Sequence, residues 1–513
     1  MDKKLTINDI TLDLESLGIN FIPNDGQTEA LITIADFLDH NNPDRTLVLS
    51  GSAGTGKSSV TKILLGYIEQ NRKLHYGVSL ATPTHKAKAT LKRLSGSEGK
   101  YPVSTMHSML GLRPNVDIVE FDAKNIEFLL DDSFLYEEIP TGMLYIFDES
   151  GMIPDDLYDY IIKVLLQKDE SIPTKIIFLG DAKQLSPVDQ DSISRVFTAP
   201  DVQVNLNKVE RVVDGNVILE TVTELRDHSA EIFETITNNK SGIIVYNDPK
   251  EFMRTLRDKY RVAIEKGDTD DVKMLCYTNK RVNQFNYALC NALDMKDPLQ
   301  IGGFYMGNSN YISPWTTSKA STIYKEFLKP RGVTDPSFRF LHKPSVYNGS
   351  DYILLYKEKI SINLNDRILG SVGGFYIEML DVVEGKISAL KMLDPDLPKS
   401  TYDELARSIE RLRLNAIDKS VPKSVRNSFW KYYFNLQNSF TSLYDLVYEG
   451  RVIRKADFVT GYALTVHRSQ GSSIREVFID ADDLKKCKLD ENLRQLQYVA
   501  CSRAREYIHI LQK

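Results

Sequence analysis

The first part of the chain alternates short apolar runs with longer stretches in which apolar residues recur at helical spacing. Between Thr46 and about Val188, four runs, TLVLS, VSLAT, MLYIF and KIIFLG, each end at a polar or glycine-rich turn. Continuous apolar runs of this length are typical of strands buried on both faces of a parallel sheet. The pattern predicts a doubly wound α/β domain, in which ligands bind beyond the carboxyl ends of the strands.

A second set of buried-strand patterns is split along the rest of the chain. VKMLCYT begins at Val272, whereas VFIDA and YIHIL follow only at 477–481 and 507–511. The simplest explanation is a second α/β domain interrupted by an insertion at 302–456. Within this insertion, two segments with alternating apolar residues, separated by Asn-Gly and Glu-Gly turns, predict a small antiparallel barrel, and residues 401–417 predict a helix.

Composition and charge narrow the class of protein. A chain of 513 residues with 42% hydrophobic and 26% charged residues predicts several folded domains. It contains no apolar run of the roughly 20 residues needed to span a bilayer and its N-terminus lacks an apolar signal core, so we expect a cytoplasmic protein without a membrane partner. The four cysteines show no zinc-binding or disulfide spacing.

The formal net charge of −6 argues weakly against a nucleic-acid partner, so any nucleic-acid surface must be local. One stretch, 399–431, holds eight Lys or Arg against four Asp or Glu and leads into aromatic residues. A solvated amphipathic helix with its aromatic residues packed inward explains this composition equally well.

The turn after TLVLS carries the strongest chemical signal. Residues Gly51 to Ser58 match the complete G-x-x-x-x-G-K-S phosphate-binding pattern, between a predicted strand and a predicted helix. The backbone N–H groups of such a loop surround the phosphates of ATP, Lys57 reaches the β and γ phosphates, and the Ser58 hydroxyl binds Mg²⁺. The predicted nucleotide-binding residues in this loop are Gly51, Ala53, Gly54, Thr55, Gly56, Lys57, Ser58 and Ser59.

Acidic and amide side chains follow two other predicted strands. Asp148 and Glu149 end MLYIF, and we expect Asp148 to hold Mg²⁺ while Glu149 acts as the general base that activates water. A lone Asp-Glu pair is commonly a solvated turn, but its place after a buried strand favours the functional interpretation. Gln184, in the loop after KIIFLG, is a candidate sensor of the γ phosphate.

These three motifs, with others in the same order, resemble the superfamily 1 DNA helicases of the 5′-to-3′, RecD-like class, including the Dda helicases of tailed phages. The likeness covers nearly the whole chain. The further segments that carry it are NDGQTEA (24–30), ATPTHKA (81–87), VSTMHS (103–108), LNKVER (206–211), CYTNKRVN (276–283), GYALTVHRSQG (461–471) and QYVACSRAR (497–505).

The resemblance implies a domain organisation. Residues 1–205 form a first RecA-like ATPase domain, with a strand-separating pin at about 110–142. Residues 206–301 and 457–513 form a second RecA-like domain, and 302–456 form an accessory domain with a Src-homology-3-like barrel and a helical tower. The segment between 283 and 461 is longer than in the Dda helicases, and no wedge residue is assigned within the pin.

The resemblance also implies further roles. Gln27 would recognise adenine, and Arg211 and Arg503 would stabilise the transition state when the two domains close over ATP and Mg²⁺. Short donors at strand ends would hold DNA phosphates and sugars without reading sequence. The candidate DNA contacts are Pro83, Thr84, His85, Thr105, His107, Tyr277, Asn279, Thr465, His467 and Ser469.

The motifs are consistent with three candidate functions. The first is a helicase that moves 5′ to 3′ on single-stranded DNA and unwinds duplex DNA. The second is a single-strand translocase that displaces proteins or remodels forks, and the third is a P-loop switch without motor activity, which needs neither a second α/β domain nor two separate arginine-bearing motifs. We expect a monomer acting on single-stranded and forked DNA, with RNA still open as a substrate. Candidate partners are single-strand-binding or replication proteins in a bacterial cytoplasm if the protein is phage-encoded.

Overall fold

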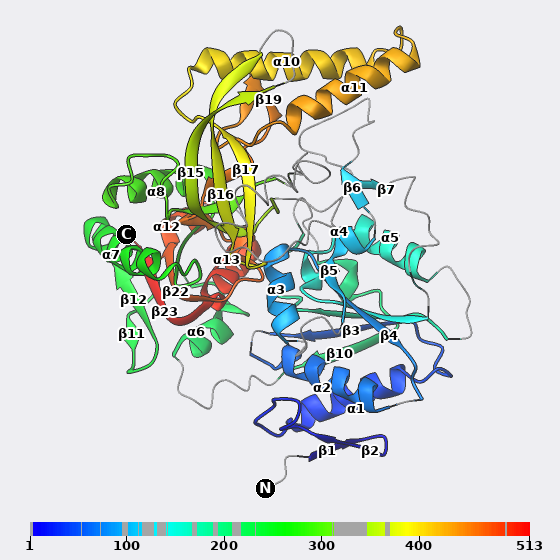
Figure 1. Cartoon of the computed structure of the whole chain (residues 1–513). Coiled ribbons are helices and arrows are strands. Elements are labelled where there is room, and N and C mark those ends of the chain that lie inside the picture. The colour runs from blue at the N-terminus through cyan, green and yellow to red at the C-terminus, as the bar shows by residue number, and fades with distance from the viewer. Residues whose placement is uncertain are drawn as a thin grey trace.

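The computed structural model places two α/β domains side by side, with a third, antiparallel sheet standing above them (Figure 1). It describes a set of ranges along the chain, and all structural statements refer to these. They are residues 4–52, 54–71, 73–94, 101–110, 112–114, 128–130, 140, 142–166, 172–187, 193–207, 217–230, 232–309, 311, 346–364, 370–487 and 490–512.

The first domain is built on six parallel strands in the order β10-β3-β9-β8-β4-β5. The four predicted strands are confirmed as β3, β4, β8 and β9, and two strands at the sheet edges, β5 and β10, extend the set. Their bounds are β3 (Thr46–Gly51), β4 (Gly77–Thr82), β5 (Val103–Thr105), β8 (Met143–Phe147), β9 (Lys175–Gly180) and β10 (Val202–Leu206).

Helices cover both faces of this sheet. Leu47 and Leu49 of β3 face one hydrophobic cluster, whereas Val48 between them belongs to a second cluster on the other face. This division confirms the predicted doubly wound arrangement. The helices are α1 (Asp25–Phe37), α2 (Lys57–Gln70), α3 (His85–Leu94), α4 (Met106–Met109) and α5 (Asp155–Leu165), with short turns η2 (Ser150–Met152) and η3 (Arg195–Phe197).

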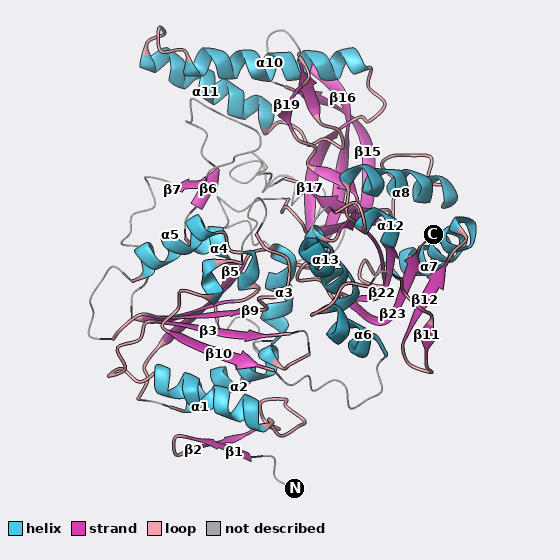
Figure 2. Ribbon diagram, turned by 180° about the vertical axis from the view of Figure 1, so that it is seen from behind, coloured by secondary structure: helices cyan, strands magenta, loops and turns pink. Residues whose placement is uncertain are grey.

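A hairpin not predicted from the sequence precedes this domain. Strands β1 (Lys4–Ile7) and β2 (Ile10–Asp13) pair antiparallel and lie beneath α1 and α2 (Figure 2). Alternate residues of the hairpin, among them Leu5, Ile7 and Leu12, join the hydrophobic cluster under those helices. The hairpin thus extends the core of the first domain.

The second domain unites segments from both sides of the insertion, in the order β11-β12-β23-β22-β13-β21. β13 pairs parallel with β22 and β21, which confirms the predicted second sheet. Its strands are β11 (Ile236–Thr237), β12 (Gly242–Tyr246), β13 (Val272–Cys276), β21 (Ala463–Thr465), β22 (Ile474–Asp480) and β23 (Ala504–Leu511). Its helices are α6 (Val217–Leu225), α7 (Pro249–Lys266), α8 (Asn279–Ala292), α12 (Ala481–Leu484) and α13 (Asp490–Ser502), with the turn η8 (His467–Ser469).

The inserted sheet has five antiparallel strands in the order β17-β16-β15-β14-β20. They are β14 (Phe304–Gly307), β15 (Asp351–Asn363), β16 (Ser371–Asp381), β17 (Lys386–Leu393) and β20 (Phe458–Thr460). Gly385, with φ +64°, makes the predicted turn between β16 and β17. Because β20 pairs with β14, this sheet reaches Thr460, beyond the predicted end of the insertion at Ala456.

Two helices lie above the inserted sheet, α10 (Lys399–Ile417) and α11 (Lys423–Gln437), followed by the hairpin β18 (Leu446–Tyr448) and β19 (Arg451–Arg454). The helix predicted at 401–417 is confirmed. In the pin region, β6 (Leu112–Pro114) and β7 (Phe128–Leu130) form an antiparallel pair, and most of the remaining residues between 110 and 142 lie outside the described residues. Among the described helices, none combines the length and apolar character needed to cross a membrane.

Candidate nucleotide and DNA site

The carboxyl ends of the central strands bring the three predicted nucleotide motifs to one edge of the first sheet. Ser50 of β3 lies beside Gly180 of β9, and Phe147 of β8 lies beside Phe178 of the same strand. The phosphate-binding loop, Asp148 and Glu149, and the loop with Gln184 each continue from one of these ends. Parallel strands thus assemble side chains that are up to about 130 positions apart in the sequence.

The phosphate-binding loop depends on two glycines in the left-handed region. Gly54 and Gly56 have φ +88° and +89°, and Gly56 caps the N-terminus of α2. A Cβ on Gly56 would lie 2.4 Å from Nε2 of Gln27, so both the backbone conformation and the space require glycine. The Ser52 hydroxyl is buried in this loop without a hydrogen-bond partner. A buried loop with an unsatisfied donor at a helix N-terminus fits the binding of phosphate.

Lys57, the first residue of α2, folds back onto its own loop. Its Nζ donates to the carbonyl oxygens of Gly51 and Ser52. These contacts hold the ammonium group over the loop, within the region where phosphate oxygens would replace the carbonyls. Ser58 and Ser59 follow in the first turn of the helix, with Ser58 exposed, and Ala53 lies outside the described residues.

Gln27 connects α1 to the phosphate-binding loop. Its Nε2 donates to the carbonyl oxygen of Thr55 (3.0 Å), and its Oε1 accepts from the backbone N–H of Asn24 (3.1 Å) in a capping box. The side chain is only 2% exposed. In this arrangement Gln27 positions the loop, and its recognition of adenine stays a prediction.

Asp148 and Glu149 lie at the end of β8 in an unusual conformation. Glu149 has φ +52°, which for a residue with a side chain costs about 1–3 kcal/mol and is characteristic of functional sites. Burial, and then the charge of Glu149, raise the pKa of Asp148 to about 6, while the nearby charge of Lys57 opposes the shift.

Two adjacent carboxylates whose charges repel fit a divalent cation. Mg²⁺ is commonly held by one or two carboxylates and by substrate phosphates rather than by a cage of protein ligands. Among the described residues, no cluster of three or more His, Cys, Asp or Glu side chains suited to a metal occurs.

The raised pKa of Asp148 predicts a pH-dependent requirement for Mg²⁺. Because the cation binds the carboxylate, a proton competes with it once the pH approaches about 6, whereas an aspartate at its ordinary pKa of 3.8 would remain ionised. We expect the free Mg²⁺ concentration for half-maximal ATP hydrolysis to be about fourfold higher near pH 5.5 than near pH 7.5. Steady-state hydrolysis measured against buffered free Mg²⁺ checks this, and an unchanged half-saturation would contradict it.

The loop that carries Gln184 contacts the second domain. The Tyr498 hydroxyl on α13 donates to Oδ2 of Asp181 (2.5 Å), and both side chains are buried. Leu185, next to Gln184, packs into the hydrophobic cluster of the second domain beside α6 and α13. The ATP edge of the first domain is therefore coupled to the second domain by a hydrogen bond and by apolar contact. Sequence reasoning did not identify Tyr498 or Leu185, although both lie in segments that carry the family likeness.

The structure describes one of the two arginines that were predicted to stabilise the transition state. Arg503 is 6% exposed at the end of α13, where its guanidinium donates to the Val499 carbonyl and to the Ser502 hydroxyl. It directly follows the helix that carries Tyr498, and its contact with a γ phosphate stays a prediction. Arg211 lies outside the described residues.

Most predicted DNA contacts gather at two sheet edges. Thr82 of β4 pairs with Thr105 of β5, so the residues that follow β4, namely Pro83, Thr84 and His85, are neighbours of Thr105. In the second sheet, Cys276 pairs with Thr465, which brings Tyr277 and Asn279 near Thr465 and His467. The rings of Tyr277 and His467 are 6.3 Å apart between centroids, and burial lowers the pKa of His467.

Several of these side chains also have local roles. Thr84 Oγ1 accepts from the backbone N–H of Ala87, and Thr105 Oγ1 accepts from that of Ser108, so both cap helices. Ser469 is fully buried and donates to the Val466 carbonyl, so it holds the turn η8 in this arrangement, and its DNA contact stays a prediction. The His107 side chain lies outside the described residues.

Comparison with known proteins agrees with this geometry. Residues 23–245 match a family model described as an AAA domain, and residues 460–511 match one described as a UvrD-like helicase C-terminal domain. An uncharacterised protein of Acanthamoeba polyphaga mimivirus is 23% identical over 92% of this chain and 96% of its own length. The ATP-dependent DNA helicase Dda of Enterobacteria phage T4 is 28% identical over 63% of this chain and 73% of its own.

Among solved structures, a Pif1 helicase from Bacteroides in complex with ADP-AlF3 and single-stranded DNA covers 96% of this chain and 92% of its own, at 15% identity and a TM-score of 0.46. The first family model contains the phosphate-binding loop and reaches into β12 of the second domain, and the second model contains Arg503. The motifs, the two family models and the helicase relatives together support a superfamily 1 helicase of the RecD-like class.

Proposed function

We propose that this protein is an ATP-dependent DNA helicase that moves 5′ to 3′ along single-stranded DNA and unwinds the duplex ahead of it. The observation that carries the proposal is the connection between the nucleotide edge of the first domain and helix α13 of the second, made by Asp181 and Tyr498. A P-loop switch requires no such second domain. A motor, in contrast, requires that ATP binding and hydrolysis change the relative orientation of two DNA-binding domains.

The proposed mechanism assigns each side chain a step. Lys57 leaves its loop carbonyls to bind the β and γ phosphates, and Glu149 takes a proton from the attacking water. Asp148 and Ser58 would hold Mg²⁺, which neutralises charge on the phosphates when bound. Gln184 contacts the γ phosphate and transmits its loss through its loop. Arg211 and Arg503 reach the transition state only when the domains close, so hydrolysis reopens the cleft.

DNA is proposed to lie across the two edges that carry the candidate contacts. One group follows β4 and β5 in the first domain, and the other follows β13 and β21 in the second. Closure of the two domains shortens the distance between the two groups of DNA contacts, and opening lengthens it. If one group releases the strand on closure and the other on opening, the strand moves in one direction. Contacts with phosphate and sugar suit such movement because they do not depend on sequence.

The accessory parts are assigned by the same proposal. The five-stranded inserted sheet would close into a Src-homology-3-like barrel, and the antiparallel pair β6–β7 would belong to the strand-separating pin. Support comes from the antiparallel order of the inserted strands and from the position of β6 directly after α4, at the DNA edge of the first domain. Single-stranded and forked DNA are the proposed substrates.

Stimulation of ATP hydrolysis by single-stranded DNA would distinguish a DNA motor from a P-loop switch. We expect single-stranded DNA to raise the rate of ATP hydrolysis at least about tenfold, which corresponds to about 1.4 kcal/mol of transition-state stabilisation. Steady-state hydrolysis is measured without nucleic acid, with single-stranded DNA, and with RNA of the same sequence. A rate that no nucleic acid changes would point to the switch, and stimulation by RNA alone would overturn the proposed substrate.

A further inference from the structure

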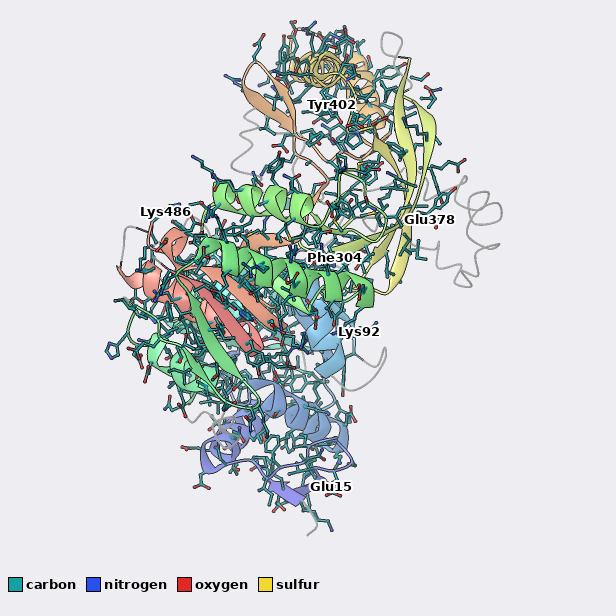
Figure 3. The ribbon with its side chains drawn as sticks, turned by 90° about the vertical axis from the view of Figure 1, so that its left-hand side faces the viewer. Glu15, Lys92, Phe304, Glu378, Tyr402 and Lys486 are labelled. Atoms are coloured by element: carbon teal, nitrogen blue, oxygen red, sulfur yellow. The ribbon has the colours of Figure 1, made fainter. Side chains whose placement is uncertain are left out.

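Helix α3 carries two lysines beside the candidate DNA contacts, where a lysine can bind DNA phosphate. Lys86 and Lys88 follow the candidate DNA contacts Thr84 and His85, in a basic first turn at the DNA edge. In the structure their ammonium groups contact carboxylates of the other two parts of the molecule. Helix α3 itself lies at the foot of the inserted sheet (Figures 1 and 3).

Lys86 joins three domains at one point. Its Nζ lies 2.7 Å from Oδ2 of Asp351, at the start of β15 in the inserted sheet, and 2.8 Å from Oδ1 of Asp270, just before β13 in the second domain. The other carboxylate oxygen of Asp351 contacts Nζ of Lys273 at 3.0 Å, and Lys273 also donates to the carbonyl oxygen of Gly461. Asp351 is 3% exposed and Lys273 1%.

Electrostatics favours the charged forms of Lys86 and Asp351, which form the direct contact between the first domain and the inserted sheet, whereas burial lowers the pKa of Lys273. Burial alone would lower the pKa of Lys86, but Asp351 and Asp270 outweigh it and hold that pKa above its ordinary value. Burial alone would raise the pKa of Asp351, yet the charges of Lys273 and Lys86 together keep it below its ordinary value.

The distribution of charge makes the contact reversible. The cluster holds two cations and two anions, and Lys86 is the cation that belongs to the first domain. If that domain withdraws, Lys273 and Asp351 remain as a neutral buried pair, while Lys86 and the partly exposed Asp270 enter water. Separation therefore leaves no uncompensated charge in the interior, which would be the main cost of breaking a buried ion pair.

Three further contacts join α3 to the same surface. Lys88 Nζ lies 2.7 Å from Oε1 of Glu384, in the turn between β16 and β17, and both side chains are 18% exposed. The ring of His85 lies against that of Tyr347, with 3.8 Å between centroids. Gly471, after η8, approaches Ala87 so closely that a Cβ on it would lie 3.0 Å from the Ala87 Cβ.

We propose that helix α3 is an electrostatic latch that holds the first domain against the inserted sheet and the second domain, and that its opening and closing couples ATP hydrolysis to strand separation. Lys86 and Lys88 are thus positioning residues: they fix the helix whose N-terminus presents Thr84 and His85, and they link that DNA edge to the accessory region. This role rests on the proposed helicase function. It explains how the inserted sheet would move together with the two ATPase domains.

Charge reversal of the more exposed pair tests the latch. Lys88→Glu and Glu384→Lys each replace attraction by repulsion, and we expect each to raise the number of ATP molecules hydrolysed per duplex displaced by about three- to tenfold, while hydrolysis without DNA is unchanged. The double variant restores the pair in the opposite sense and should return this ratio to within about twofold of wild type. Lys73→Glu, at an exposed position of the first domain outside α3, is the control for charge alone and should leave the ratio unchanged.

Hydrogen exchange supplies a second readout that does not depend on helicase activity. Both single reversals should speed amide exchange in α3 and in the turn at 381–386, and the double variant should restore protection. Lys86→Met should speed exchange in α3 without affecting the Lys273 and Asp351 pair, since that pair stays neutral. Failure of the double variant to restore both readouts, or single reversals that change neither, would overturn the latch. If the wild-type protein displaced no strand, the proposed function would be overturned. Amide hydrogen exchange in the variants would then still test whether the ion pairs hold α3 in place.

Discussion

Replacement of Lys57 by alanine is expected to abolish ATP hydrolysis while single-strand DNA binding stays within a small factor of wild type. Lys57 supplies the ammonium group that neutralises the β and γ phosphates, and no other lysine or arginine lies in the phosphate-binding loop at 51–58. Loss of this charge should lower the rate to below about a thousandth of wild type.

The reason for retained DNA binding is spatial. The candidate DNA contacts follow β4, β5, β13 and β21, whereas Lys57 follows β3 and its Nζ donates to carbonyl oxygens of its own loop. The variant should therefore keep its fold and its DNA surfaces. Steady-state hydrolysis and fluorescence anisotropy with a labelled single strand provide the two measurements.

Lys62→Ala is the matched control, because Lys62 lies on the same helix and its Nζ contacts the Gly18 carbonyl, away from the loop. It should hydrolyse ATP at close to the wild-type rate. Hydrolysis retained by Lys57→Ala would remove the basis for the nucleotide site. Loss of DNA binding together with hydrolysis would show that the two sites are not separate.

The parts of the fold that could be predicted from the sequence are those encoded within short segments. The apolar runs of β3, β4, β8 and β9 are buried on both sides, so each is recognisable alone, and the polar residues after them indicate the ligand edge. The phosphate-binding loop was predictable for the same reason, because its glycines, its lysine and its flanking elements are consecutive.

The parts that could not be predicted depend on contacts between distant segments. The β1–β2 hairpin is recognisable only through the core that it joins beneath α1 and α2, and β20 belongs to the inserted sheet only because it pairs with β14. Nothing in the segment around Lys86 indicates its partner Asp351, which lies 265 positions away. Gln27 likewise makes its buried hydrogen bond to Thr55, 28 positions along the chain.

Movement on DNA is expected to have a single direction. In the proposed mechanism, ATP-driven closure makes the two domains hold the DNA strand in turn. Because the DNA contacts of the first and second domains differ, their order along the strand sets the direction of movement. The protein must therefore enter a fork along one strand only. A partial duplex with a single-stranded 5′ tail should therefore be unwound rapidly in the presence of ATP. The same duplex with a 3′ tail, or with blunt ends, should yield almost no product.

Strand displacement from the tailed duplexes decides between the candidate functions, with Lys57→Ala as the control without hydrolysis and an RNA-tailed duplex as the control for substrate. The proposed function predicts ATP-dependent release of the displaced strand from the 5′-tailed DNA alone. Displacement confined to the 3′-tailed DNA would reverse the assigned direction. Stimulated ATP hydrolysis without release from either tailed duplex would contradict the helicase and favour a single-strand translocase.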